Sequence, residues 1–245
     1  GRNLLEETQF YKETIFHLIY STTPSPARGN GYEIFPYDDD EMWQYGSSAS
    51  SSYYGDFMTA MAGYFKDKPV GQYARHWLNV VKPPTAKYIR ALDKDAGELT
   101  FDTLPLDYYV PGSAQSFYLR NNWGSSATVI NLAMGYAVGA SHQHLDSGTF
   151  QIIRGDKWLS RETVGYSDTI AGYYKNAVDV RETISHNGIV FNGKGLAAAY
   201  ADGPAKVTRL ESKENYAYAA VDLSQAYRAH SSGYPDRDDN PYASH

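Results

Sequence analysis

The chain lacks cysteine altogether, and it has no long apolar run and no excess of positive charge. Without a cysteine in its 245 residues, it can form neither disulfides nor thiolate metal sites, so a transition-metal site would need His and carboxylate ligands. No stretch approaches the ~20 apolar residues of a membrane-spanning helix. The net charge of −6 argues against a nucleic-acid-binding protein. An anionic sugar can still bind at a local cationic cleft on an acidic protein.

The chain also begins without methionine, at Gly1-Arg2-Asn3, and without the pattern of a signal peptide. We therefore expect a processed or excised start. In contrast, tyrosine is abundant, with 23 residues, and aromatic residues make up 15% of the chain. Most of these rings are expected to pack helices and sheets, although aromatic rings with polar tips also suit sugar-binding clefts.

The first third of the sequence has the apolar spacing of helices. Such runs cover about 4–19, 54–65 and 70–81, and a proline-containing segment ends each of them. A short further helix is expected near 86–92. Helices with wide apolar faces joined by loops are typical of a helical bundle, a toroid or a solenoid. We assign residues 1–98 to this helical part.

From about residue 99 the pattern changes to that of antiparallel strands. Apolar residues alternate around Ile130–Leu132, around Phe150–Ile153 and from Tyr216 to Val221. The sequence Arg154–Lys157 predicts a hairpin turn, and Ile189–Phe191 predicts a further strand. Residues 99–245 are therefore expected to form an antiparallel β-sandwich, with fewer strands than a whole sandwich has.

The segment Ser141–Gly148 contains the pair of histidines most able to carry chemistry. His142 and His144 would project to the same face if the backbone is extended. A third histidine, His186, lies where the strand at 189–191 is expected to begin, and Glu162 lies at the end of the strand with Trp158. Two histidines and a carboxylate with a water are a plausible tetrahedral zinc site. An H-x-H pair is a weak signal by itself, and a solvated strand end explains Glu162 equally well, so spacing leaves both interpretations open.

Four segments in order resemble the heparinase II/III-like polysaccharide lyases, a family with related alginate lyases. They are Tyr118–Trp123, His142–Gly148, Trp158-Leu159 with the acidic position that follows, and His186–Gly193. The resemblance covers about 118–195, and the helical part before it fits the end of the family's (α/α) toroid. It implies an α+β multidomain fold, in which the end of the toroid is followed by part of the antiparallel sandwich.

The resemblance also implies roles for individual residues. His142 matches the active-site histidine, His144 and His186 match zinc ligands, and Glu162 stands where the family usually has an aspartate ligand. Zn²⁺ is then the expected cofactor, in a structural role. The segment after Glu162 is expected to be a loop beside the site, and its substrate-binding candidates are Tyr166, Tyr173, Tyr174, Lys175 and Arg181. Surface residues of a mobile loop are an equal alternative for these five, and Arg120 is expected to be a buried structural partner.

By resemblance, the function is β-elimination on a uronic-acid polysaccharide of glycosaminoglycan or alginate type. The family's catalytic tyrosine and carboxylate-neutralising residue lie upstream of the H-x-H motif and have no match here, so we expect the chain to be part of a longer lyase. The implied partners are the anionic polysaccharide, the remainder of the parent chain and, as an open alternative, a second copy in a homo-oligomer. The implied location is the periplasm or outside the cell. A non-catalytic carbohydrate-binding fragment and a uronyl C5-epimerase are the rival functions.

Overall fold

The computed structural model describes ten stretches of the chain. They are residues 2–27, 31–37, 52–84, 93–112, 115–135, 144–162, 183–191, 195–196, 205–224 and 226–227. The expected helix near 86–92 lies outside them. Among the described residues, no helix has both the length and the apolar character needed to cross a membrane.

The described residues of the first part of the chain form four helices, and the bounds of these helices follow the sequence pattern closely. They are α1 (Leu4–Glu7), α2 (Phe10–Ser21), α3 (Ser52–Tyr64) and α4 (Pro69–Val81). Pro69 occupies the first turn of α4, where its missing N–H costs no helical hydrogen bond. The single helix expected over 4–19 is wrong in one respect, because Thr8 is extended and separates α1 from α2. Its hydroxyl donates to the Leu4 carbonyl oxygen over 2.8 Å, in the manner of side chains that compete with the helical backbone.

The second part contains a five-stranded antiparallel sheet in the order β1-β2-β3-β4-β5. Its strands are β1 (Asp107–Tyr109), β2 (Ser116–Arg120), β3 (Thr128–Ala133), β4 (Thr149–Arg154) and β5 (Lys157–Ser160). A 3₁₀ helix, η3 (Phe101–Thr103), precedes β1. The expected hairpin turn is confirmed, since Arg154 pairs with Lys157. Gly155 takes a φ of 57° there, a value that glycine adopts without steric cost.

A separate hairpin, β6 (Lys206–Lys213) and β7 (Tyr216–Asp222), forms a two-stranded sheet. This hairpin confirms the strand that the alternation at Tyr216–Val221 predicted.

The strand expected at Ile189–Phe191 is wrong. A 3₁₀ helix, η5 (Thr183–Ser185), lies just before this segment, and of the three residues only Phe191 takes part in an isolated bridge. Apolar β-branched residues form a strand only where a partner strand pairs with them, and here the Ile189 carbonyl oxygen accepts a hydrogen bond from the Tyr227 hydroxyl.

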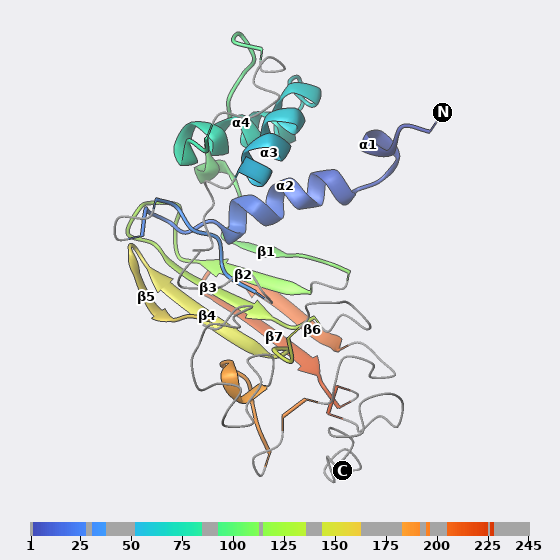
Figure 1. Cartoon of the computed structure of the whole chain (residues 1–245), viewed down its shortest axis with the longest axis vertical. Helices are drawn as coiled ribbons and strands as arrows, with labels where there is room; N and C mark the ends of the chain where they lie inside the picture. The colour runs from blue at the N-terminus through green and yellow to red at the C-terminus, as the bar shows by residue number, and fades with distance from the viewer. Residues whose placement is uncertain are drawn as a thin grey trace.

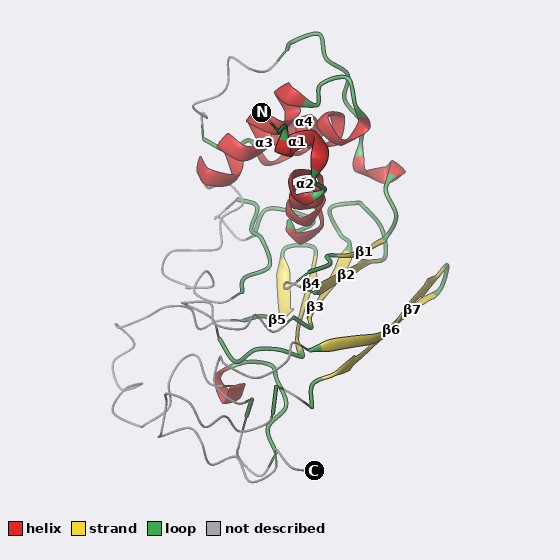
Figure 2. Ribbon diagram, turned by 90° about the vertical axis from the view of Figure 1, so that its right-hand side faces the viewer, coloured by secondary structure: helices red, strands yellow, loops and turns green. Residues whose placement is uncertain are grey.

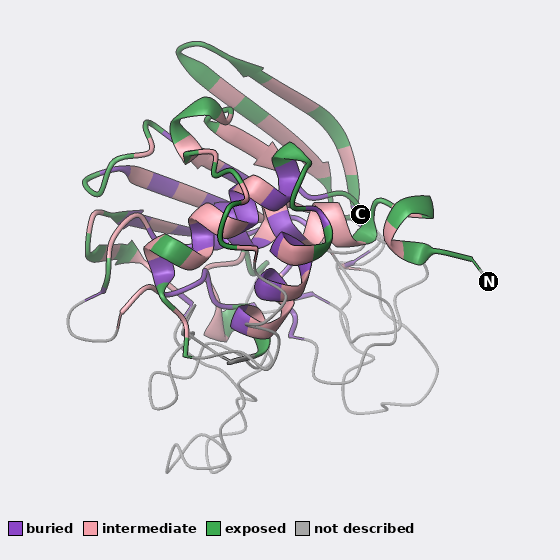
Figure 3. Ribbon diagram, turned by 90° about the horizontal axis from the view of Figure 1, so that it is seen from above, coloured by how far each residue is buried: buried purple, intermediate pink, exposed green. Residues whose placement is uncertain are grey.

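The helices lie on one side of the five-stranded sheet, with α2 between the sheet and the α3–α4 pair (Figures 1 and 2). One apolar core runs through both layers, from Ile15 and Trp77 in the helices to Val129 and Ile153 in the sheet. Viewed from above, buried residues alternate with half-buried ones along the helices, whereas the N-terminal segment is largely exposed (Figure 3). On the opposite side of the sheet, Phe150 is 42% exposed.

The structure thus confirms an α+β chain with a few helices and an antiparallel sheet. The assignment of the helices to a toroid and of the two sheets to a sandwich stays a prediction. So does the division of the chain into 1–98 and 99–245.

Candidate functional site

The three expected zinc ligands, His144, Glu162 and His186, come together in one buried cluster. His144 is 0% and Glu162 2% exposed, and the His186 side chain is 1% exposed. The two imidazole rings have their centroids 5.1 Å apart. His142 and the five substrate-binding candidates, Tyr166, Tyr173, Tyr174, Lys175 and Arg181, lie outside the described residues.

Within this cluster Glu162 is held by two donors. The Nδ1–H of His186 donates to Oε2 of Glu162 over 2.7 Å, and the backbone N–H of Asn187 donates to Oε1 over 3.2 Å. The Asn187 side chain in turn donates to the carbonyl oxygen of Phe150 in β4 over 3.1 Å. A buried carboxylate needs such donors, because burial without them costs several kcal/mol, roughly 1–3 for each missing hydrogen bond.

His144 sits at the start of a tight turn that returns the chain to β4. The Gly148 N–H donates to the Ala133 carbonyl oxygen at the end of β3 over 2.7 Å, and the Ser147 hydroxyl donates to the Met134 carbonyl oxygen over 3.1 Å. Gly148 has a φ of +88°, which favours glycine at this position. The turn therefore fixes His144 beside the end of β3 and the start of β4.

The loop that carries His186 is tied to the same turn through Thr183, which is fully buried. The Thr183 hydroxyl donates to the Leu145 carbonyl oxygen over 2.8 Å and accepts the N–H of Leu196 over 2.9 Å. A Cβ at Gly195 would lie 2.4 Å from the Thr183 Cβ, so the backbone can approach this closely only with glycine. All three cluster residues lie on loops and turns. Glu162 follows the end of β5, as expected, whereas His186 follows η5 and does not lie at the start of a strand.

Gln151 of β4 is a positioning residue that the sequence analysis missed. Its side-chain oxygen accepts the N–H of Glu162 over 3.2 Å, and its side-chain nitrogen donates to the Pro36 carbonyl oxygen over 2.7 Å. Gln151 is 1% exposed, and it links the segment 31–37 to the loop after β5. The sequence did contain a signal for this role. Gln151 alternates with Ile153 in the predicted strand, and a polar side chain on the buried face of a strand usually has a hydrogen-bond partner.

A buried carboxylate, Glu33, makes a second link between the same two segments. Its Oε2 accepts the indole N–H of Trp158 over 2.8 Å and lies 3.7 Å from a guanidinium nitrogen of Arg161. The Arg161 guanidinium also lies over the Trp158 ring, 5.2 Å from its centroid. These contacts hold the end of β5, and therefore the residue that precedes Glu162, against segment 31–37.

A histidine–tyrosine pair, His17 and Tyr118, lies between α2 and the sheet. The Tyr118 hydroxyl lies 3.1 Å from Nε2 of His17, and the Tyr37 ring lies 6.3 Å from the His17 ring. Burial raises the pKa of the Tyr118 hydroxyl far above its usual range, and burial lowers the pKa of His17 to about 4. Both groups are therefore neutral near pH 7, so the hydroxyl donates to the ring. A phenol that resists ionisation is a poor base, and we assign the pair a packing role.

The cluster can be tested against the zinc expectation by its chemistry and by its contacts. Two imidazoles and one carboxylate are donor types that zinc accepts. Among the residues that the structure describes, however, no three His, Asp or Glu side chains are arranged to hold one ion. In the structure, the Nδ1–H of His186 is directed at the carboxylate of Glu162. The donor types therefore fit zinc, while the structure shows two of the three residues hydrogen-bonded to each other.

Comparison with known proteins gives likeness at the level of structure only. No family model and no curated protein matches the sequence. The heparan sulfate lyase HepC from Pedobacter heparinus matches 84% of the chain with 18% identity and a TM-score of 0.54. A heparinase III structure matches 82% with 15% identity and a TM-score of 0.54. A heparinase III known as the BT4657 gene product matches 85% with 15% identity and a TM-score of 0.53.

The matched part is a limited share of each neighbour, because the chain spans 27% of the length of HepC and 28% of that of the heparinase III structure. Identities of 15–18% establish fold and do not carry activity from one chain to another. The resemblance stated from the motifs is confirmed at this level. The chain has the fold of about a quarter of the heparinase III structures.

Proposed function

We propose that the chain is part of a polysaccharide lyase that cleaves uronic-acid-containing polysaccharides by β-elimination. The observation that supports this most is the buried cluster of His144, Glu162 and His186, which includes the second histidine of the H-x-H motif, in a chain with the fold of heparinase III structures. The substrate would be a glycosaminoglycan or an alginate-type polymer. The proposal places the protein in the periplasm or outside the cell.

The reaction makes specific demands on the groups at the site. A base removes the proton on C5 of the uronic acid, and the glycosidic bond at C4 breaks as the C4–C5 double bond forms. Charge develops on the sugar carboxylate during this step and must be stabilised by donors placed in advance. His142 is proposed for proton transfer, because the pKa of an imidazole in water lies near neutrality.

The other proposed residues bind metal or substrate. His144, Glu162 and His186 would hold a zinc ion that ties the turn at 144–148 to the loops after β5 and η5. Zinc in this place would supply rigidity. The cations Lys175 and Arg181 would pair with carboxylate or sulfate groups. Tyr166, Tyr173 and Tyr174 would stack on or hydrogen-bond to the sugar rings.

The deciding experiment compares His142→Ala with Gln143→Ala in the full-length protein. Gln143 is the middle residue of the same motif and has no assigned role, so it is a matched control. Elimination leaves an unsaturated uronate that absorbs ultraviolet light, and this absorbance is followed on heparan sulfate, chondroitin and alginate. His142→Ala should lower kcat by on the order of 10²-fold or more, the scale of a lost proton-transfer group. Similar kcat values for both variants would remove His142 from the catalytic residues.

The two rival functions give different results in the same assay. A carbohydrate-binding protein would retain the polymer and produce no absorbance. An epimerase would also produce none, but it would incorporate solvent deuterium at C5. Absorbance that rises with wild-type protein on at least one of these polymers excludes both rivals.

A further inference from the structure

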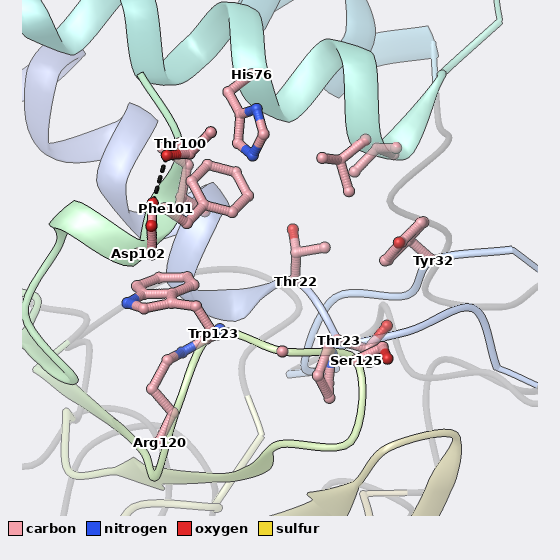
Figure 4. A pocket seen from close by; sticks show the side chains of 15 residues that line it. Thr22, Thr23, Tyr32, His76, Thr100, Phe101, Asp102, Arg120, Trp123 and Ser125 are labelled. Carbon is pink, nitrogen blue, oxygen red and sulfur yellow. Dashed lines mark hydrogen bonds between the residues drawn. The ribbon is translucent and has the colours of Figure 1, made fainter. Parts of the chain in front are cut away.

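A second site lies at the opposite end of the sheet from the histidine cluster, between α2, α4 and the β2–β3 turn. A cavity of about 500 Å³ opens there. The residues that matter for its chemistry are Thr23, Tyr32, Phe101, Arg120, Trp123 and Ser125. Figure 4 shows these side chains around the cavity, with Arg120 extending from β2 toward the Trp123 ring. We call this cavity the Arg120 pocket. Its volume lies in the range of roughly 300–1,000 Å³ that small-molecule sites occupy.

Arg120 is the unusual group in this pocket. It is 8% exposed, and among the described residues no carboxylate forms an ion pair with it. One terminal nitrogen donates to the Tyr20 carbonyl oxygen over 3.3 Å, whereas Nε is buried without a hydrogen-bond partner in the described part of the chain. A buried cation is normally paired with an anion or with several acceptors. Here the described residues supply one carbonyl oxygen, that of Tyr20.

Aromatic rings hold the guanidinium in place. Its central carbon lies 3.7 Å from the Trp123 ring centroid and 5.8 Å from that of Tyr20. The Trp123 indole N–H donates to the Leu104 carbonyl oxygen over 3.1 Å, which fixes the orientation of the ring. Stacking of this kind stabilises a cation without neutralising it. The positive charge therefore remains available to an anion that enters the pocket.

The rest of the lining matches a sugar better than a purely apolar ligand. Phe101, Trp123 and Tyr32 line the cavity with aromatic side chains, which suit contact with the C–H groups of a sugar. Ser125 at the rim adds a hydroxyl. The hydroxyl of Thr23 is already used, since it donates to the Ser25 carbonyl oxygen and accepts the N–H of Glu33.

We propose that the Arg120 pocket binds one carboxylated sugar residue, with Arg120 receiving the carboxylate and the aromatic lining contacting the ring. The choice of a uronic acid as ligand rests on the proposed function, whereas the charge preference rests on Arg120 alone. The pocket is separate from the histidine cluster. It would therefore hold a part of a polysaccharide chain away from the bond being cleaved.

The test uses ligand-observed NMR with sodium glucuronate, glucose and sodium acetate as probes. Glucuronate should bind the wild-type protein at least about tenfold more tightly than glucose or acetate, because it alone meets both the cation and the rings. Glucose or acetate binding as tightly as glucuronate would overturn the proposal, and so would the absence of glucuronate binding.

Two rim variants locate the binding without disturbing buried Arg120. Ser125→Trp should fill the pocket and abolish glucuronate binding. Ser126 is the exposed neighbour of Ser125 and lies outside the lining, so Ser126→Trp should leave binding unchanged.

Asp102→Asn removes a carboxylate from the rim and should tighten binding about twofold to fivefold, the scale of one exposed charge interaction. Equal binding by Ser125→Trp and Ser126→Trp would overturn the proposal. The NMR experiment measures glucuronate binding and needs no catalytic turnover. The kcat of His142→Ala therefore tests the proposed lyase function, and glucuronate binding tests the Arg120 pocket, so either proposal can fail while the other stands.

Discussion

At the scale of single residues, the histidines of this chain occupy contrasting environments. His144 and His186 share a buried cluster with Glu162, whereas Nδ1 of His76 pairs with the partly exposed Glu98 on the surface of the helical layer. His17 contacts the Tyr118 hydroxyl between helix and sheet. Because the three surroundings differ, we expect substitution of His144 to change metal binding, substitution of His17 to change stability at low pH, and substitution of His76 to affect neither.

The zinc proposal predicts that His144→Ala removes the metal. Elemental analysis after dialysis should find about one zinc per chain in the wild type and almost none in the variant. Excess zinc should stabilise the wild type by about 2.7 kcal/mol at a hundredfold excess over Kd and should not stabilise the variant. His76→Ala is the control, because it removes a histidine far from the cluster. Equal zinc content in the two variants would exclude His144 as a ligand.

The lowered pKa of His17, about 4 against an ordinary 6.5, predicts an acid-sensitive fold. Between these values the unfolded chain binds a proton that the folded chain does not, so the free energy of unfolding falls as pH falls from 6.5 to 4. The loss attributable to His17 is at most about 3 kcal/mol. Above pH 6.5 the group contributes no pH dependence.

The measurement is urea unfolding at pH 7 and pH 4.5 for the wild type and for His17→Gln. Glutamine can accept the Tyr118 hydrogen bond but does not titrate. The variant should lose less stability on acidification than the wild type. Parallel losses in the two proteins would show that another group carries the acid sensitivity.

At the scale of elements, the corner between α3 and α4 depends on a glycine. The backbone of Gly71, in the first turn of α4, packs directly on the end of the preceding turn. A Cβ at this position would lie 2.1 Å from the Phe65 carbonyl oxygen. Because the obstructing atom belongs to the backbone, no side-chain rotation can relieve the contact.

Gly71→Ala should therefore destabilise the protein by about 1–3 kcal/mol or more, the usual cost of overpacking. Gly97→Ala is the matched control, because its added methyl group meets only the flexible Gln72 side chain, 3.2 Å away. Thermal unfolding of the two variants gives the comparison. If both melt alike, the close packing of α4 on Phe65 does not limit stability.

At the scale of the whole molecule, the helices and the five-stranded sheet share one core. Tyr20 of α2 shows this connection, since its ring stacks on Tyr108 with centroids 4.7 Å apart and its hydroxyl donates to the Pro105 carbonyl oxygen over 2.8 Å. Trp77 of α4, fully buried, donates to the Thr22 hydroxyl over 2.8 Å. Apolar contacts that continue across both layers should make them unfold together.

Ile153→Ala tests this cooperativity from the sheet side. Ile153 is 0% exposed, and its truncation should cost about 2–5 kcal/mol. The helical circular dichroism signal and tryptophan fluorescence should shift to the same lower urea midpoint. Leu159→Ala, on the exposed face of the neighbouring strand, should change stability by less than about 0.5 kcal/mol. Separate midpoints for the two signals would mean that the helices and the sheet are independent units.

The elements that the sequence predicts well are those specified by local pattern. Helices α3 and α4 follow apolar spacing bounded by proline, and the β4–β5 hairpin follows from alternation around Gly155. These features depend on neighbours within a few residues along the chain, so the local sequence is enough to predict most of them. The strand expected at Ile189–Phe191 failed because strand formation depends on a partner strand that the local sequence does not specify.

What the amino-acid sequence determined by itself is therefore the locally patterned elements such as α3, α4 and the β4–β5 hairpin, the exclusion of thiol chemistry and the order of motifs that indicates a lyase fold. Only the tertiary structure decided which side chains meet. His17 and Tyr118 lie 101 residues apart in the chain, and Gln151 and Pro36 lie 115 apart. The hydrogen bond between His186 and Glu162 and the stacking of Arg120 on Trp123 likewise depend on how loops and layers pack. Such contacts arise when segments distant in sequence bury a common core, and no local period along the chain encodes them.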